Sequence, residues 1–298
     1  MKKVLVIYYS QSGQLESIAR AVAGPMVKSE DIDVTFYQIE MENPFPFPWD
    51  KKSFFSVFPE SFLQVPSTLK PVPDSILNTR FDLVLLHYQV WYLSPSIPIN
   101  SFLQSGEAKA ILNHTPVVTI SGSRNMWIMA QEKIKKLLSD NSAALKGNIA
   151  LIDRAGNLIS VVTIVKWMFS GEKKRYLGIF PLPGVSDKDI RDSERFGKII
   201  ASHLREDMLD GLQEELLAHD SVKINSYLVT VDRTANKIFS KWSKLISSQQ
   251  EHRSLLLKVF NVYLWVAIWF ISPIVYLLHV SSYPFRISKL KQESDYYR

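Results

Sequence analysis

A loop rich in small polar residues follows the first apolar segment of the chain. Residues 4–9 form a continuous apolar run, Ser10-Gln11-Ser12-Gly13-Gln14 interrupts it, and Leu15 begins a pattern with helical spacing. Hydroxyl groups and backbone amides at a helix N-terminus bind phosphate, because the amide donors and the helix dipole both favour an anion. The loop lacks both the GxGxxG and the GxxxxGK(S/T) patterns of nucleotide sites. It therefore predicts a site for a monophosphate ester, although similar loops also occur as purely structural turns.

Two later loops carry side chains that complement such a phosphate site. The third expected strand is followed by Gln89, Val90, Trp91 and Tyr92. The fourth is followed by Ser121, Gly122, Ser123, Arg124 and Asn125. The adjacent aromatic residues are suited to stacking on a flat ring, and the later loop supplies amides and one cation. Because the carboxyl ends of parallel strands meet at one edge of a sheet, the three loops together predict a flavin site.

The elements that position these loops alternate between strand and helix. Short apolar segments rich in β-branched residues predict strands at 4–9, 33–39, 81–88, 116–120 and 148–152. Helical spacing predicts helices that start at 15 and lie at 100–103, 126–138 and 187–204. Gly24-Pro25 is expected to end or kink the first helix. This alternation indicates a doubly wound α/β fold with a parallel sheet.

The same segments resemble a known family of flavoproteins. Ser10-Gln11-Ser12-Gly13 resembles the flavodoxin phosphate loop, residues 81–103 resemble the third-strand region of flavodoxin-like NAD(P)H oxidoreductases, and residues 185–204 resemble their last helix. The resemblance covers about residues 1–205. It implies a five-stranded flavodoxin-like sheet, in the order 2-1-3-4-5, that binds FMN. Leu15 stands where many flavodoxins have a third hydroxyl residue, so the phosphate would depend on Ser10, Ser12 and amides.

Three stretches resemble, more narrowly, the dialkylresorcinol condensing enzymes of bacterial gene clusters. These stretches are residues 8–15, the Pro-Phe-Pro-Trp sequence at 46–49, and Arg124-Asn125-Met126-Trp127. The resemblance implies an FMN-dependent oxidoreductase that aromatises a cyclohexanedione, made by a partner ketosynthase, to a dialkylresorcinol in lipid or pigment biosynthesis. An NAD(P)H-dependent quinone reductase and a flavin-free scaffold for the ketosynthase are the alternatives.

Three residues are candidates for the catalytic chemistry. Arg124 is placed to stabilise a developing enolate or the reduced flavin, and His87 or Tyr88 to move a proton. A structural residue at the end of a strand is an equally good interpretation of His87.

Two segments depart from the alternating pattern. Residues 43–73, the insert, interleave prolines with aromatic residues, which predicts either a loop packed on the core or a lid over the site. Residues 206–258 are expected to form a helical extension, and 286–298 a basic tail. Residues 259–285 contain no Asp, Glu, Lys or Arg and are long enough to cross a bilayer, although a kink at Pro273 fits a bent, half-inserted helix equally well. The alternative is a helix buried against the domain or in a homodimer interface.

Composition narrows the classes of function. The chain has 298 residues and a net charge of +6, with no run of arginines or basic-aromatic repeat, so a nucleic acid partner is not expected. It contains no cysteine, and its six histidines lack metal-binding spacing, so no metal site is predicted. The N-terminus does not resemble a signal peptide. We therefore expect a cytoplasmic protein with a lipophilic substrate, held at the inner membrane by its C-terminal apolar segment.

Overall fold

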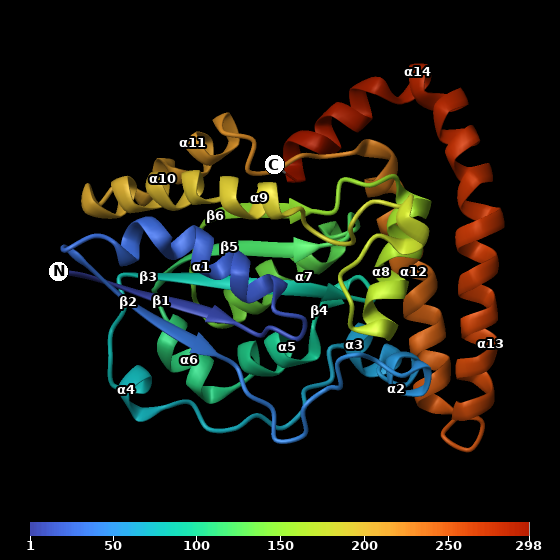
Figure 1. Cartoon of the computed structure of the whole chain (residues 1–298), viewed down its shortest axis with the longest axis horizontal. Coiled ribbons are helices and arrows are strands. Elements are labelled where there is room, and N and C mark those ends of the chain that lie inside the picture. Colours follow the sequence, from blue (N-terminus) through green and yellow to red (C-terminus); the bar gives the residue numbers. More distant parts are fainter. Residues whose placement is uncertain (298) are drawn as a thin grey trace.

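The computed structural model describes residues 1–297, apart from the side chains of 278, 282–287 and 289. The side chains of Arg286 and Lys289, part of the expected basic tail, thus lie outside the described residues, as does Arg298. Five parallel strands form the centre of the molecule (Figure 1): β1 (Lys2–Tyr8), β2 (Ile32–Gln38), β3 (Leu83–Trp91), β5 (Pro116–Ser123) and β6 (Ala144–Ile152).

The strand order confirms the predicted fold class. The five parallel strands lie in the order β2-β1-β3-β5-β6, which is the 2-1-3-4-5 order of flavodoxin-like sheets. A sixth strand that was not expected, β4 (Ser94–Pro95), pairs antiparallel with the end of β3. The chain therefore reverses direction tightly at the edge of the sheet where the site is predicted.

Helices cover both faces of this sheet. Val4, Val6 and Tyr8 of β1 pack toward the face covered by α1 (Gln14–Val27), α9 (Asp187–Asp192), α10 (Glu194–Arg205) and α11 (Leu212–Ala218). Leu5 and Ile7 pack toward the other face, under α4 (Asp74–Leu77), α5 (Ile97–Leu103), α6 (Gly106–Leu112) and α7 (Ile128–Asp140). Because both faces are buried, the strands appear in the sequence as continuous apolar runs.

Two helix boundaries differ from the sequence prediction. Helix α1 continues through Gly24-Pro25 to Val27, and the predicted helix at 187–204 is divided at Ser193 into α9 and α10. Where α1 continues toward Gly24-Pro25, it approaches α10 closely. A Cβ atom on Gly197 would lie 1.9 Å from the carbonyl oxygen of Val22, so only glycine fits at this contact.

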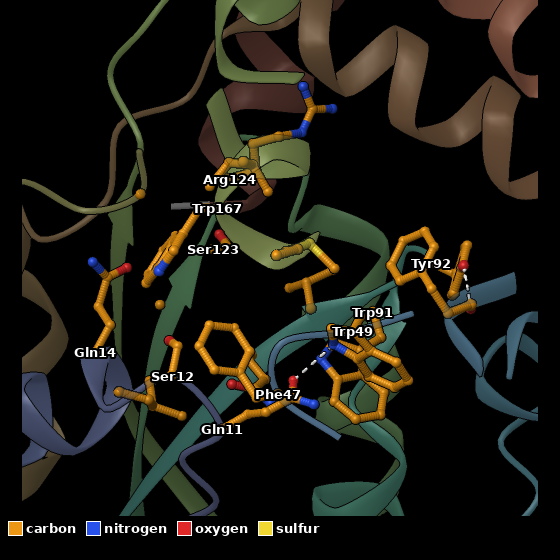
Figure 2. Close-up of a pocket in the computed structure, with 18 of the residues that line it drawn as sticks. Gln11, Ser12, Gln14, Phe47, Trp49, Trp91, Tyr92, Ser123, Arg124 and Trp167 are labelled. Atoms are coloured by element: carbon orange, nitrogen blue, oxygen red, sulfur yellow. Dashed lines mark hydrogen bonds between the residues drawn. The ribbon is translucent and has the colours of Figure 1, made fainter. Parts of the chain in front are cut away.

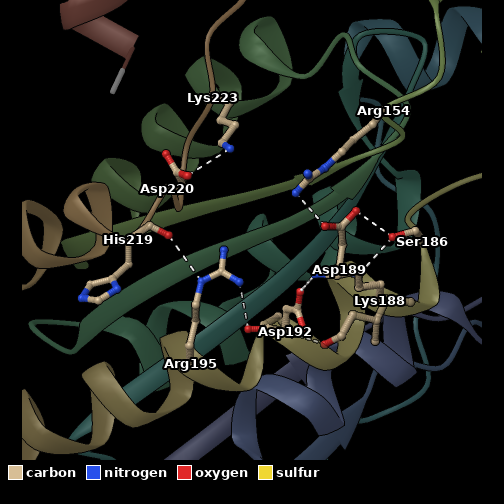
Figure 3. A network of polar contacts seen from close by, with 11 residues as sticks. Arg154, Ser186, Lys188, Asp189, Asp192, Arg195, His219, Asp220 and Lys223 are labelled. Atoms are coloured by element: carbon tan, nitrogen blue, oxygen red, sulfur yellow. Dashed lines mark hydrogen bonds and ion pairs between the residues drawn. The ribbon is translucent and has the colours of Figure 1, made fainter.

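A surface network joins α9 and α10 to the segments on either side of them (Figure 3). Arg154, in the loop after β6, pairs with Asp189 at 2.6 Å. The Nε of Arg195 donates to the carbonyl oxygen of His219 at 3.4 Å, at the end of α11. Exposed ion pairs contribute little stability, so we interpret the network as fixing the path of these loops.

The insert folds as two helices of six residues each, α2 (Lys51–Ser56) and α3 (Phe58–Leu63). Phe58 is fully buried and stacks on Phe260 with ring centroids 3.9 Å apart. An ion pair of 2.8 Å between Glu60 and Arg253 lies beside this stack. The two segments that departed from the alternating pattern are therefore in direct contact with each other.

The C-terminal region consists of long helices that stand across the carboxyl edge of the sheet (Figure 1). They are α12 (Ser226–Ser248), α13 (Arg253–Val266), a π-helical turn η3 (Ala267–Ile271) and α14 (Ser272–Tyr297). Helix α8 (Asn157–Ser170), which the sequence analysis did not predict, lies between these helices and the sheet. Two short 3₁₀ turns lie earlier in the chain, η1 (Tyr176–Gly178) after α8 and η2 (Leu209–Gly211) after α10. Pro273 is the second residue of α14, just after the π-helical turn, and it has no backbone N–H to donate to the preceding turn.

The apolar segment exposes one of its faces. Residues Arg253–Ser281 form one helix that is long and apolar enough to cross a membrane, and 6% of its most apolar window is buried. Val262, Phe270 and Leu277 are each about two-thirds exposed, whereas Phe260 is fully buried against the insert. One side of this helix therefore packs on the protein and the opposite side presents apolar side chains outward.

Candidate functional site

A cavity of about 240 Å³ lies at the carboxyl edge of β1, β3 and β5 (Figure 2). We call it the strand-edge cavity. Eleven of the predicted residues line it: Gln11, Ser12, Gln14, Leu15, Gln89, Val90, Trp91, Tyr92, Gly122, Ser123 and Arg124. Ser10, Gly13, Ser121 and Asn125 lie next to it in the same loops without lining it. The structure thus brings the three predicted loops together at one site.

The first loop has the geometry of an anion site. Gly13 is the N-cap of α1 and has a left-handed backbone, with φ of +81°, which favours glycine. The Ser10 hydroxyl accepts a hydrogen bond from the amide of Glu16 at 3.3 Å, so it is used within the loop. Ser12 is exposed and lines the cavity. Because the first amides of a helix have no acceptor within the helix, those of Gln14 and Leu15 are available to donate to an anion next to Ser12.

The two glutamines of this loop hold neighbouring segments in place. Gln11 donates to the carbonyl oxygen of Pro46 at 2.7 Å and accepts from the indole nitrogen of Trp49 at 3.1 Å. Gln14 bonds both backbone groups of Val185, at 3.0 and 3.1 Å. Their side chains are therefore engaged with the insert and with the segment before α9, and the phosphate site consists of amides and Ser12.

Aromatic rings form the walls of the cavity. Trp91 meets Phe45 and Trp49 nearly at right angles, with ring centroids 5.1 and 5.4 Å away. Phe47 meets Trp167 of α8 in the same way at 6.3 Å. A cleft between such rings suits a flat, largely apolar ligand. The sequence analysis placed the insert near the site but did not identify Phe47, Trp49 or Trp167 as site residues.

Two buried polar atoms at the strand-edge cavity have no hydrogen-bond partner among the described residues. They are the side-chain amide nitrogen of Gln89 and the hydroxyl of Ser123. Buried polar groups are normally satisfied, so unpartnered ones at a cavity indicate a ligand or water. A Cβ atom on Gly122, in the same loop as Ser123, would lie 2.9 Å from the side chain of Leu15, so close packing against α1 favours glycine there. The donor set therefore fits a phosphorylated flat ring with a polar edge.

Arg124 lies at the boundary between this cavity and a second one. Its guanidinium points away from Gln11 and Ser12 (Figure 2) and donates to Asn157, to the backbone oxygen at 3.0 Å and the side-chain oxygen at 2.9 Å. Burial lowers the pKa of Arg124 to about 10, while Asp153 and Asp232 act in the opposite direction. The group is therefore still a cation at neutral pH.

The structure does not bring His87 and Tyr88 to the cavity. Both are fully buried in the sheet. His87 Nδ1 lies 3.2 Å from the carbonyl oxygen of Leu85, and burial lowers the pKa of His87 to about 4. The Tyr88 hydroxyl donates to Gln131 at 2.7 Å, and burial raises the pKa of Tyr88. Their position within the core separates them from the other predicted site residues.

Comparisons with known proteins give fold-level likenesses. A flavoprotein in complex with FMN from Lactobacillus acidophilus NCFM is 18% identical and covers 50% of this chain and 93% of its own, with a TM-score of 0.40. A flavodoxin from the domain Archaea is 13% identical (69% and 99% covered, TM-score 0.39), and flavodoxin 1 from Bacillus cereus is 15% identical (68% and 99%, 0.37). No protein-family model and no curated protein matches the chain. The fold assignment therefore rests on strand order and connectivity.

Among the described residues, no group of three or more His, Asp or Glu side chains is placed to hold a metal ion.

Proposed function

We propose that the protein is an FMN-dependent oxidoreductase that acts on a lipophilic ring compound. One observation carries this proposal: the strand-edge cavity combines a helix N-terminus with free amides and, beside it, a cleft walled by aromatic rings. A ligand that fills both parts has a phosphate ester at one end and a flat ring at the other. FMN has this shape.

Different residues of the strand-edge cavity would bind the phosphate and the ring of FMN. Ser12 and the first amides of α1 would bind the phosphate, and the rings of Phe47, Trp91 and Trp167 would enclose the flavin. The unpartnered groups of Gln89 and Ser123 would bond its polar edge. When bound, FMN supplies a two-electron acceptor for a ring substrate that loses two hydrogens.

We further propose that the reaction is the aromatisation of a cyclohexanedione to a dialkylresorcinol, with a ketosynthase as partner. The sequence resemblance at residues 8–15, 46–49 and 124–127 supports this choice. Arg124 is the only charged residue that lines the strand-edge cavity among the described residues. It is a cation at neutral pH and would stabilise negative charge on a substrate oxygen as the ring enolises.

A quinone reductase that takes electrons from NAD(P)H is the second candidate. The same aromatic walls would accept a quinone, and the electrons would flow in the opposite direction. A flavin-free scaffold for the ketosynthase is the third, and the unpartnered polar atoms at the cavity argue against it.

We also propose that the exposed apolar face of α13, η3 and α14 lies in the cytoplasmic side of the inner membrane. Val262, Phe270 and Leu277 are too exposed and too apolar to remain in water without an apolar partner. A homodimer through this face is the alternative, and crosslinking in lipid nanodiscs distinguishes the two.

The flavin proposal is tested on the purified full chain. We expect about one FMN per chain in the absorption spectrum and a rise in melting temperature when FMN is added. Under anaerobic conditions, an alkylated cyclohexane-1,3-dione should bleach the flavin. Bleaching by NADPH with reoxidation by a quinone would favour the reductase instead. A protein that contains no flavin and is not stabilised by FMN would contradict both enzymatic proposals.

A further inference from the structure

A second cavity, of about 290 Å³, lies between α8, α12 and the helix formed by α13, η3 and α14. We call it the apolar chamber. Most of its lining is aliphatic and comes from the C-terminal helices, including Ala235 and Ile238 of α12 and Leu264, Ile268 and Ile271 of the outer helix. At about 30 Å³ for each water-sized unit, the volume corresponds to roughly ten such units, which is enough for a six-carbon chain and the edge of a ring.

The charged group of the chamber lies at its inner end, where Arg124 is next to Asn157, and no Asp or Glu lines the chamber in the part of the chain that the structure describes. The hydroxyl groups of Thr234 and Ser272 also line it, but they are bonded to Thr230 and Tyr227. One of the three guanidinium nitrogens of Arg124 is bonded to Asn157, and a second contacts the sulfur of Met126 at 3.5 Å. A guanidinium has five N–H donors and no acceptor, so donors remain for a ligand. The head of that ligand must accept hydrogen bonds, as a ketone or phenol oxygen does.

The two cavities share one wall. Val90, Tyr92 and Arg124 line both of them. Tyr92 and Leu93 form the tight turn between β3 and β4 and have φ values of +48° and +60°, a left-handed conformation that such turns usually give to Asn or Gly. Strained residues of this kind persist where the surroundings fix them, and they gather at ligand sites. A hydrogen bond from the Tyr92 hydroxyl to the carbonyl oxygen of Phe54, at 2.7 Å, holds this turn in its left-handed conformation.

The outer wall of the chamber is a single helix. Leu264 and Ile268 face the chamber and are half-buried, whereas Phe270 and Ile274 on the opposite side are 69% and 58% exposed. The π-helical turn at Ala267–Ile271 lies in this wall, and such turns frequently occur at functional sites. The chamber is therefore separated from the exposed apolar face only by the thickness of this helix.

From this arrangement we propose that the apolar chamber is the substrate site, and that it binds a ring compound carrying an alkyl chain. The ring oxygen bonds Arg124 beside the strand-edge cavity, and the alkyl chain extends between α12 and η3. The identity of the head group rests on the proposed function, whereas the existence of an amphiphile site rests on the chamber alone.

The test uses the full chain in phosphatidylcholine nanodiscs and, as probe, a resorcinol with a six-carbon chain that ends in a diazirine. After irradiation, we expect peptide mapping to find the label on the inward residues Ile238, Leu264 and Ile268. Unlabelled 4-hexylresorcinol should compete and resorcinol should not, because each buried methylene strengthens binding about fourfold. Label confined to the outward residues Phe270 and Ile274 would overturn the proposal, as would equal competition by resorcinol.

A pair of variants on adjacent residues controls for general effects of a bulky side chain. Ala267→Trp fills the chamber, whereas Val266→Trp places the same ring on the exposed side of the helix. We expect the first to reduce inward labelling by roughly tenfold and the second to leave it unchanged. FMN content is measured in parallel. Inward labelling of a protein that holds no flavin would refute the proposed function and keep the chamber as an amphiphile site.

Discussion

The two cavities of this protein are built by different means. The strand-edge cavity is formed by loops that parallel strands bring to one edge, so its position follows from the topology of the sheet. The apolar chamber has no such origin, because α12, α13 and η3 form it by packing against α8 and the insert. The first kind of site survives large changes elsewhere in the chain, whereas the second depends on a few apolar contacts.

This difference separates the two parts of the proposed function. Phosphate binding needs the first turn of α1, which is supported by the core between the sheet and α1, α10 and α11. Recognition of an alkyl chain needs the C-terminal helices, which are held by the cluster of Phe58, Phe239 and Phe260 and by the ion pair of Arg253 with Glu60. Substitutions in one region should therefore leave the function of the other in place.

The largest expected effect is on the docking of the C-terminal helices. Phe260 is fully buried and stacks on Phe58, so Phe260→Ala should weaken this packing by about 3–5 kcal/mol. Hydrogen exchange should show α13 opening while the FMN content stays unchanged. Val262→Ala, on the exposed side of the same helix, serves as the control and should alter neither. Loss of flavin from the Phe260 variant would show that the two regions act as one unit.

The next effect concerns the phosphate. Gly13→Asp places a carboxylate beside the bound anion, which costs roughly 2–4 kcal/mol of FMN affinity at an effective dielectric constant near 20. Titration of the apoprotein with FMN measures this loss. Gly13→Asn is the matched control, because asparagine has nearly the shape of aspartate and meets the same left-handed backbone at φ of +81° without adding a charge. If Gly13→Asp binds FMN no more weakly than Gly13→Asn, the phosphate does not lie at this loop.

The sheet could be predicted well from the sequence because the pattern that indicates a buried strand lies within a few consecutive residues. Strands buried on both faces, such as β1, appear as unbroken apolar runs, and the three loops at their ends were identified from their residue types. Helix α8 was missed because Val161, Val162, Ile164 and Val165 are β-branched and do not favour helix, so tertiary packing determines its form. Trp167 was missed with it.

Other features depend on contacts between distant residues. The stack of Phe58 on Phe260 joins residues about 200 positions apart, and no local pattern marks it. Arg124 was correctly placed at the end of a strand, but Asn157 determines the direction of its side chain. His87 was considered for proton transfer because it lies near a strand end. Strand β3 instead continues to Trp91, which places His87 within the sheet, two residues before the first residue that lines the cavity.

The aromatic wall provides a smaller test of the same separation. Trp91→Ala removes a ring from the strand-edge cavity and should weaken FMN binding by roughly 1–3 kcal/mol while reducing the quenching of flavin fluorescence. Trp242→Ala removes an equal ring from the packing of α12 on α13 and should leave FMN binding unchanged. Similar losses in both variants would mean that the two cavities are energetically coupled.

The smallest expected effect is a pH dependence confined to the C-terminal helices. Asp232 of α12 is fully buried and accepts a hydrogen bond from the amide of Met129 at 3.3 Å, at the start of α7. Burial raises the pKa of Asp232 to about 7, although the amides of Ile128 and Met129 and the charges of Lys133 and Arg124 act in the opposite direction. The carboxyl group is thus half protonated near pH 7 when α12 is docked.

When α12 is detached, the same group ionises with a pKa near 3.9. The docked state therefore holds more protons between pH 4 and 7, and docking weakens as the pH rises through this window. Between pH 6 and pH 8 we expect a loss of about 1 kcal/mol, with little further change above. Hydrogen exchange of α12 across this range measures the loss, and the strands of the sheet provide the internal reference. Asp232→Asn should abolish the dependence, whereas Asp140→Asn, at an exposed carboxylate of α7, should retain it. A pH dependence that persists in the Asp232 variant would assign it to another group.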